Sequence, residues 1–145
     1  MFKLDQGMDT GPILGQVVIP VEDDETATSL YEKVVASHRT LVRQTYPRIA
    51  DGTIGPIPQD ESQATVWPGR KPSDGLLDLE SMSPAEVDRY VRALTRPYPG
   101  AFVRINEEKI LRIWEGHVGS GAGRTLTTPT GSYTATEFEE EVVDV

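Results

Sequence analysis

The 145-residue sequence contains no cysteine, which excludes disulfide bonds, cysteine nucleophiles and thiolate metal sites. No cluster of residues with metal-ligand spacing is present either. No apolar run reaches the length that spans a bilayer, and the N-terminus has no signal-peptide core. The default interpretation is a soluble, cytoplasmic protein that holds no metal and has no membrane partner.

Apolar residues are also scarce, at 37% of the chain, which is below the usual fraction for a compact domain. The 13 glycines and 11 prolines predict many turns, so we expect a modest core with long connections. Basic residues are outnumbered by acidic ones, and the net charge is -9. This charge opposes non-specific attraction to nucleic-acid phosphates and to anionic lipid.

The first third of the sequence has the pattern of two strands followed by a long helix. Residues 1–16 contain an apolar lead-in, a turn rich in Gly and Asp, and a resumed apolar run, which predicts a strand, a loop and a second, buried strand over 13–21. Apolar residues at three- and four-residue spacing predict an amphipathic helix over 27–49. Thr26 should cap this helix, and Asp51-Gly52 should end it.

The remaining sequence predicts a linker, a second helix and a hairpin. Residues 53–80 form a connection that is unusually long for a compact domain. Ser83-Pro84-Ala85-Glu86 is typical of a helix start, and that helix must stop before Pro97. Strands over 102–105 and 110–114 should pair as a hairpin. The stretch 118–136 is rich in Gly, Ser and Thr, and Gly119-x-Gly121-x-Gly123 within it is interpreted as flexible chain. The acidic end is interpreted as a strand or a solvated tail.

Three sequence blocks follow one another in order: Asp5-Gln-Gly-Met-Asp9-Thr-Gly11-Pro, then Gln59 to Ala64-Thr65 with Arg70-Lys-Pro-Ser-Asp74-Gly75, then Val91 to Pro97-Tyr-Pro-Gly-Ala-Phe102. Together they resemble the formyltetrahydrofolate-dependent formyltransferases, especially the methionyl-tRNA and amino-sugar-nucleotide branches. The resemblance covers roughly residues 2–115. It is specific because the three blocks occur at the spacing of that family.

The resemblance implies an α/β fold. The chain is expected to be the C-terminal remnant of a Rossmann-like formyltransferase domain, followed by a linker, a helix and a small β element. The expected boundaries are 1–55 for the catalytic-domain portion, 56–82 for the linker, 83–117 for the helix and hairpin, and 118–145 for the Gly/Thr-rich acidic tail.

The resemblance also implies a catalytic role for Asp9, the Asp of the family's Asp-Thr-Gly sequence. Its carboxylate would accept a proton from the attacking amine. The five residues before it would wrap the pterin ring of the formyl donor, 10-formyltetrahydrofolate: Leu4, Asp5, Gln6, Gly7 and Met8. The alternative is that Asp5 and Asp9 are ordinary turn formers, but the downstream blocks favour the catalytic interpretation of Asp9.

The family's mechanism needs two further residues, an Asn and a His two positions later, which polarise the formyl group and stabilise the oxyanion. Asn106 is the only asparagine, and Glu108 stands two positions after it. His38 falls on the predicted long helix and His117 in a loop after the predicted hairpin. Because the Asn-x-His sequence is absent, we expect the chain alone to be inactive and to need an N-terminal half in cis or in trans.

The acceptor site is the least determined part of the sequence. Arg70, Arg92 and Tyr98 are candidate contacts to the acceptor, although the arginines are equally suited to pairing with Asp74, Asp78 or Glu86. Trp67 and Tyr98 are interpreted as linker anchors in a small core.

The resemblance implies that the acceptor is a primary amine, either of an amino-sugar nucleotide, which the last two blocks favour, or of initiator methionyl-tRNA. A non-catalytic remnant that binds a nucleotide or a protein is the alternative from another class. The sequence leaves the oligomeric state open.

Overall fold

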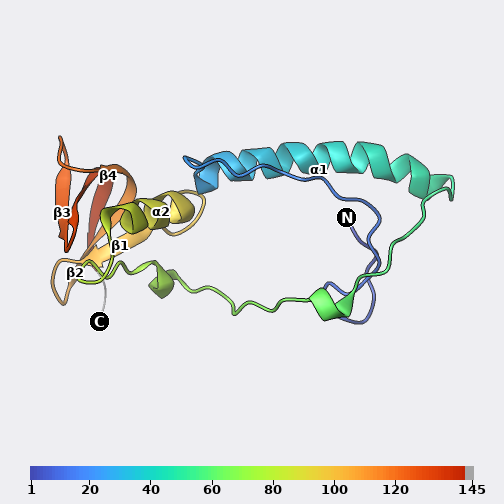
Figure 1. Cartoon of the computed structure of the whole chain (residues 1–145), viewed down its shortest axis with the longest axis horizontal. Helices are drawn as coiled ribbons and strands as arrows, with labels where there is room; N and C mark the ends of the chain where they lie inside the picture. The colour runs from blue at the N-terminus through green and yellow to red at the C-terminus, as the bar shows by residue number, and fades with distance from the viewer. Residues whose placement is uncertain (143–145) are drawn as a thin grey trace. The chain divides into compact units, whose positions relative to one another are not determined.

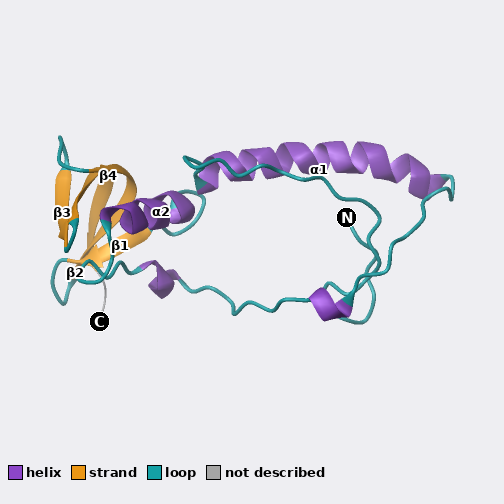
Figure 2. Ribbon diagram, in the orientation of Figure 1, coloured by secondary structure: helices purple, strands orange, loops and turns teal. Residues whose placement is uncertain are grey.

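A computed structural model describes residues 1–142 (Figures 1 and 2). The chain divides into two compact units. The first consists of Met1–Val21 with Tyr31–Pro68, and the second consists of Glu22–Leu30 with the chain from Gly69 onward. The finer division of the chain at residues 55, 82 and 117 stays a prediction.

The predicted long helix is confirmed as α1, Ala27–Ala50. Thr26 caps it: its Oγ1 accepts a hydrogen bond from the Ser29 amide at 3.1 Å, and the Ser29 hydroxyl accepts one from the Thr26 amide at 3.1 Å. The helix continues through Pro47, whose carbonyl accepts from the Asp51 amide at 3.0 Å. It ends where Gly52 takes the left-handed φ of 72°, a conformation that glycine reaches without a steric cost.

The predicted strand over 13–21 is wrong. Only isolated antiparallel bridges form in this part of the chain, from Ile13 to Phe2 and to Ile57. The amides of residues 16–19 donate no hydrogen bond to any residue of the described chain. The apolar, β-branched pattern correctly indicated extended chain, but a strand also needs a neighbouring strand to receive its backbone hydrogen bonds.

The second unit contains a four-stranded antiparallel sheet in the order β1-β2-β4-β3 (Figure 2). The strands are β1 Ala101–Arg104, β2 Lys109–Val118, β3 Arg124–Thr128 and β4 Gly131–Val142. The predicted hairpin is confirmed as β1 and β2, whose register pairs Val103 with Leu111. Two 3₁₀ turns, η1 Glu61–Gln63 and η2 Pro72–Gly75, interrupt the preceding connection.

The Gly/Thr-rich stretch after residue 118 contains β3 and β4, so the acidic end forms a strand through Val142, which is one of the two alternatives predicted for it. Residues 143–145 lie outside the described chain. Gly123 lies directly before β3 at a φ of 136°, and a Cβ there would lie 2.2 Å from the carbonyl oxygen of Ala135 on β4. Its glycine therefore permits a close approach of two strands, whereas the sequence pattern alone suggested flexibility.

The second helix, α2 Pro84–Leu94, begins and ends as predicted. The Ser83 amide donates to the Glu86 carboxylate at 2.8 Å, and the Glu86 amide donates to the Ser83 hydroxyl at 3.3 Å. This reciprocal pair satisfies two backbone donors that the helix itself leaves open. No helix of residues 1–142 combines the length and the apolar character that a membrane crossing requires.

Helix α2 packs on one face of the sheet and forms the core with it. Ten side chains are buried there: Leu77, Val87, Val91, Ala101, Val103, Leu111, Ile113, Leu126, Tyr133 and Ala135. On β4, Glu141 pairs with Arg112 of β2 through Arg112 Nη2 at 2.8 Å. The Arg112 guanidinium lowers the pKa of the Glu141 carboxyl. The acidic end of the chain is therefore partly neutralised within the sheet.

Tyr133 yields a test of this core. It is fully buried, and its hydroxyl has no hydrogen-bond partner among residues 1–142. Burial raises the pKa of this phenol because it disfavours the charged form. An unsatisfied buried hydroxyl is destabilising, so Tyr133→Phe should raise the free energy of unfolding by about 1 kcal/mol. Urea unfolding measures this change.

The control for this prediction is Tyr90→Phe, which removes the same hydroxyl from a half-exposed ring on α2. It should change the free energy of unfolding by less than about 0.5 kcal/mol. A clear loss of stability in Tyr133→Phe would show that the hydroxyl has a partner after all.

Candidate functional site

The opening loop, residues 5–10, is closed by backbone contacts between its two arms, which are the chain segments before residue 5 and after residue 10. The Lys3 amide donates to the Pro12 carbonyl at 3.0 Å, and Phe2 bridges to Ile13. Gly11 is buried where the arms meet, and a Cβ on it would lie 1.6 Å from the Lys3 carbonyl oxygen. Glycine is therefore required at this position for the loop to close.

Asp5 holds the loop from inside. Its Oδ1 accepts hydrogen bonds from the Gly7 amide at 3.0 Å and from the Thr10 hydroxyl at 2.7 Å. This is the local turn-forming role that short acidic side chains commonly have. The turn-former interpretation thus describes Asp5, and its side chain is committed to loop structure.

Asp9, on the same loop, differs from Asp5 in its exposure and its backbone conformation. It is exposed, and its φ is +59°, a left-handed value that residues other than glycine adopt rarely. None of the other residues in 1–142 forms a hydrogen bond or an ion pair with its carboxylate. The carboxylate is thus available to a bound molecule, as a proton acceptor must be.

The main chain of Asp9 has a partner that the sequence did not predict. Gln59 donates from Nε2 to the carbonyl oxygens of Asp9 and Gly11, each at 2.7 Å. In the sequence, Gln59 stands out only as the first residue of the second family-like block. Its contact crosses 50 residues of sequence, and no local pattern carries that information.

The five residues before Asp9 offer one side of a binding surface. Leu4 and Met8 are 84% and 91% exposed. The amides of Leu4, Gln6 and Met8 donate to no other residue of the described chain. Free backbone donors beside apolar side chains suit a flat heteroaromatic ring, so the loop fits one edge of a pterin. This fit concerns the loop alone.

The candidate acceptor contacts lie in the second unit. Arg92 Nε pairs with Asp88 at 2.8 Å, and its Nη1 donates to the Glu25 carbonyl at 2.8 Å. Arg92 therefore fastens α2 to the chain just before α1, and its guanidinium is occupied. Arg70 is exposed and pairs with no residue in 1–142, while Tyr98 is 51% exposed.

Other sequence interpretations change in the structure. The prediction that Trp67 anchors the linker in a small core is wrong, because Trp67 is 83% exposed. The predicted arginine partners bind elsewhere: Asp74 accepts from the Lys71 amide, and Asp78 and Glu86 accept from nearby serines. These carboxylates stabilise turns and a helix start, which is what short-range hydrogen bonding favours.

The asparagine and histidines are structural or exposed. Asn106 accepts a hydrogen bond from the Glu108 amide at 2.9 Å and shapes the β1–β2 turn. His38 is exposed on α1, as predicted, whereas His117 lies on β2 and not in a loop. None of the three lies on the opening loop. The described chain thus brings no Asn-x-His constellation to Asp9.

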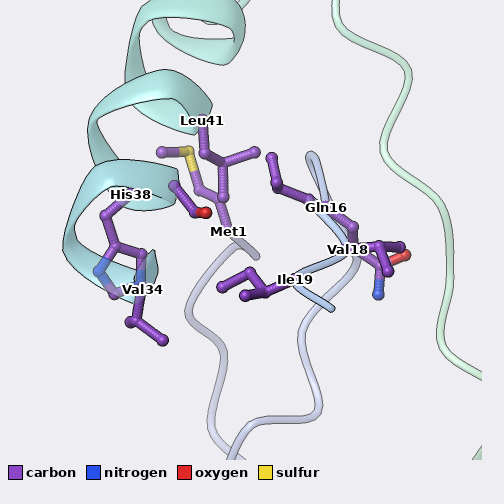
Figure 3. A pocket seen from close by; sticks show the side chains of 9 residues that line it. Met1, Gln16, Val18, Ile19, Val34, His38 and Leu41 are labelled. Atoms are coloured by element: carbon purple, nitrogen blue, oxygen red, sulfur yellow. The ribbon is translucent and has the colours of Figure 1, made fainter. Parts of the chain in front are cut away.

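A cavity of about 320 Å³ lies between α1 and the extended residues 16–19. Figure 3 shows Met1 and Leu41 between the helix and the extended segment, with Val18 on the side away from the helix. Most of its lining is apolar, and Ser37 and His38 supply polar groups from the helix. It has no acid–base pair beside a nucleophile, so we assign it no chemistry.

The arrangement of helix α2 on a four-stranded antiparallel sheet defines a formyltransferase C-terminal fold. Two solved structures carry the likeness. HypX from Aquifex aeolicus, in a six-substitution variant, is 16% identical with a TM-score of 0.75 over 94% of this chain and 26% of that chain. Methionyl-tRNA formyltransferase from Clostridium thermocellum is 18% identical with a TM-score of 0.60 over 99% and 55%.

The sequence match concerns the second half of the chain. Residues 70–141 match the model of the formyl transferase C-terminal domain, so this part of the chain is similar in sequence to that domain. The resemblance and the α/β fold class inferred from the sequence are therefore confirmed. The chain spans about a quarter of HypX and about half of the methionyl-tRNA formyltransferase.

Proposed function

We propose that this chain is the C-terminal part of an enzyme that transfers a formyl group from 10-formyltetrahydrofolate to a primary amine. The observation that carries the proposal is the Asp9 carboxylate, which is exposed and unpaired in residues 1–142 although the loop around it is held by Asp5 and Gln59. The match of residues 70–141 to the formyl transferase C-terminal domain and the likeness in fold support it.

In this proposal each part of the opening loop has one task. When bound, the donor supplies the formyl carbon. Residues 4–8 bind the edge of its pterin through their free backbone groups. Asp9 takes the proton that the amine loses as its nitrogen forms the bond to the formyl carbon, and gives it to the donor nitrogen as the bond between that nitrogen and the formyl carbon breaks. Donors for the developing negative charge on the formyl oxygen come from the Asn-x-His sequence of an upstream half.

Two surfaces of the first unit support a role for that upstream half. Residues 16–19 leave their amides unpaired within residues 1–142, which is the condition of an uncovered sheet edge. Helix α1 also exposes four large apolar side chains: Tyr31, Val42, Tyr46 and Ile49. A strand of the upstream half would pair with residues 16–19. The apolar face of the sheet that contains this strand would cover α1.

For the acceptor we propose the amine of an amino-sugar nucleotide. Arg70, which forms no ion pair within residues 1–142, supplies a cation for a diphosphate, and Tyr98 supplies a half-exposed ring for a base. The net charge of -9 opposes a tRNA acceptor, since phosphate contacts dominate RNA affinity. Arg92, Arg96 and Arg112 each pair with acidic side chains, which reduces the positive surface further.

The experiment compares the chain alone with the chain joined to an upstream formyltransferase half that carries Asn-x-His. We expect formyl transfer from 10-formyltetrahydrofolate only in the joined protein, followed by release of tetrahydrofolate. A comparable rate from the chain alone would contradict the need for an upstream half. An inactive but folded joined protein would contradict the proposed function.

A second measurement separates the two acceptors. At about 0.15 M salt the chain should not retard initiator tRNA in a gel, because its charge repels the phosphates. The joined protein should formylate an amino-sugar nucleotide, and Arg70→Ala should raise its KM. Tight tRNA binding with a steep salt dependence would instead favour methionyl-tRNA.

A further inference from the structure

Gln59 reaches the opening loop because a backbone bridge places it there. The Ile13 amide donates to the Ile57 carbonyl at 2.7 Å, and the Ile57 amide donates back at 2.9 Å. This antiparallel bridge places the segment after residue 57 beside the arm that follows the opening loop. Gln59 follows Ile57 by only two residues, so the bridge at Ile57 also fixes the position of the Gln59 carboxamide near the loop.

Within residues 1–142, the hydrogen bonds of the Gln59 carboxamide go only to the main chain of the loop. Its NH₂ group has two protons, and the two 2.7 Å bonds to the carbonyls of Asp9 and Gly11 use both. These carbonyls flank Thr10. Because neither bond involves the Asp9 carboxylate, Gln59 fixes the backbone position of Asp9 and leaves both carboxylate oxygens available.

Asp9 needs such a hold because of its backbone conformation. A φ of +59° is disfavoured for a residue with a side chain and persists where the surroundings determine it. Asp5 supports the loop on one side through Gly7 and Thr10. Gln59 is the described side chain that bonds the main chain of Asp9 itself.

We infer that Gln59 is a positioning residue for formyl transfer, whose carboxamide holds the Asp9 main chain so that the carboxylate faces the amine. This inference rests on the proposed function. It assigns Gln59 no contact with substrate. It predicts that removing the two donors, with the side-chain shape retained, loosens the loop and slows the chemical step.

The first test uses nuclear magnetic resonance relaxation of the full chain. Gln59→Glu is isosteric but has no donor for a carbonyl. The order parameters of the Asp9, Thr10 and Gly11 amides should fall from about 0.85 to below about 0.6. Gln59→Lys, which again offers donors at a similar reach, should restore them.

Gln63→Glu is the matched control in this segment, because within the described residues the Gln63 carboxamide donates only to the neighbouring Ser62 hydroxyl, at 3.4 Å. It introduces the same charge and should leave the loop rigid. A loop that stays equally rigid in Gln59→Glu overturns the inference. So does a loop that loosens equally in Gln63→Glu.

The second test measures kinetics in the protein joined to an upstream half. Gln59→Glu should lower kcat by about tenfold with little change in the KM of the amine, since misplacement acts on the chemical step. Unchanged kcat in an active enzyme overturns the inference alone. A wild-type joined protein that folds but transfers no formyl group overturns the proposed function, and the inference with it.

Discussion

Asp9→Asn is expected to lower kcat for formyl transfer by about 10²- to 10⁴-fold in the chain joined to an upstream half, the range for loss of a general base. Asparagine has nearly the same shape and tolerates the left-handed φ of 59° found at this position. The loop should keep its structure while losing its proton acceptor. Steady-state kinetics with the amine acceptor measure the effect, and KM should change little.

Asp5→Asn is the matched control for this prediction, because it removes a second carboxylate from the same loop. Both hydrogen bonds of Asp5 are accepted by one oxygen, Oδ1, and the asparagine amide retains that acceptor. Its kcat should stay within about threefold of wild type, a barrier change below 1 kcal/mol. Equal losses in the two variants would mean that loop charge matters and that Asp9 has no special role.

The sequence predicted the helix boundaries well because short-range hydrogen bonds set them. The Ser83–Glu86 pair and the Thr26–Ser29 pair each join residues three positions apart, and both are visible in the sequence. By contrast, β4 pairs with β2 through contacts such as Arg112 with Glu141, 29 residues away. A run of glutamates has no local feature that indicates arginine partners, so the sequence predicts either a strand or a solvated tail there.

The opening loop shows the same limit in the candidate site. Its Gly and Asp residues predicted a tight turn, and the family resemblance implied a special Asp9. The resemblance did not separate the loop-forming Asp5 from the unpaired Asp9, and it gave no role to Gln59. Those distinctions depend on which oxygen accepts which donor, and one of the donors lies 50 residues away.

The second largest effect is expected at Leu111 in the sheet core. Leu111 is 1% exposed on β2, opposite Val103 of β1, and belongs to the cluster that includes Val87 and Val91 of α2. Leu111→Ala should lower the free energy of unfolding by about 2–5 kcal/mol, since it removes buried methyl groups and leaves a cavity. Denaturant unfolding followed by tryptophan fluorescence at Trp114 on the same strand measures this loss.

Two controls separate a cavity from a general intolerance of substitution. Leu111→Met conserves most of the volume and should cost less than about 1.5 kcal/mol. Leu4→Ala makes the same chemical change on the opening loop, where Leu4 is 84% exposed, and should cost less than about 0.5 kcal/mol. If Leu111→Ala cost no more than Leu4→Ala, the α2–sheet packing would not be the core of this unit. If Leu4→Ala left stability intact but weakened folate binding in the joined protein, the exposed leucine would be part of the donor site.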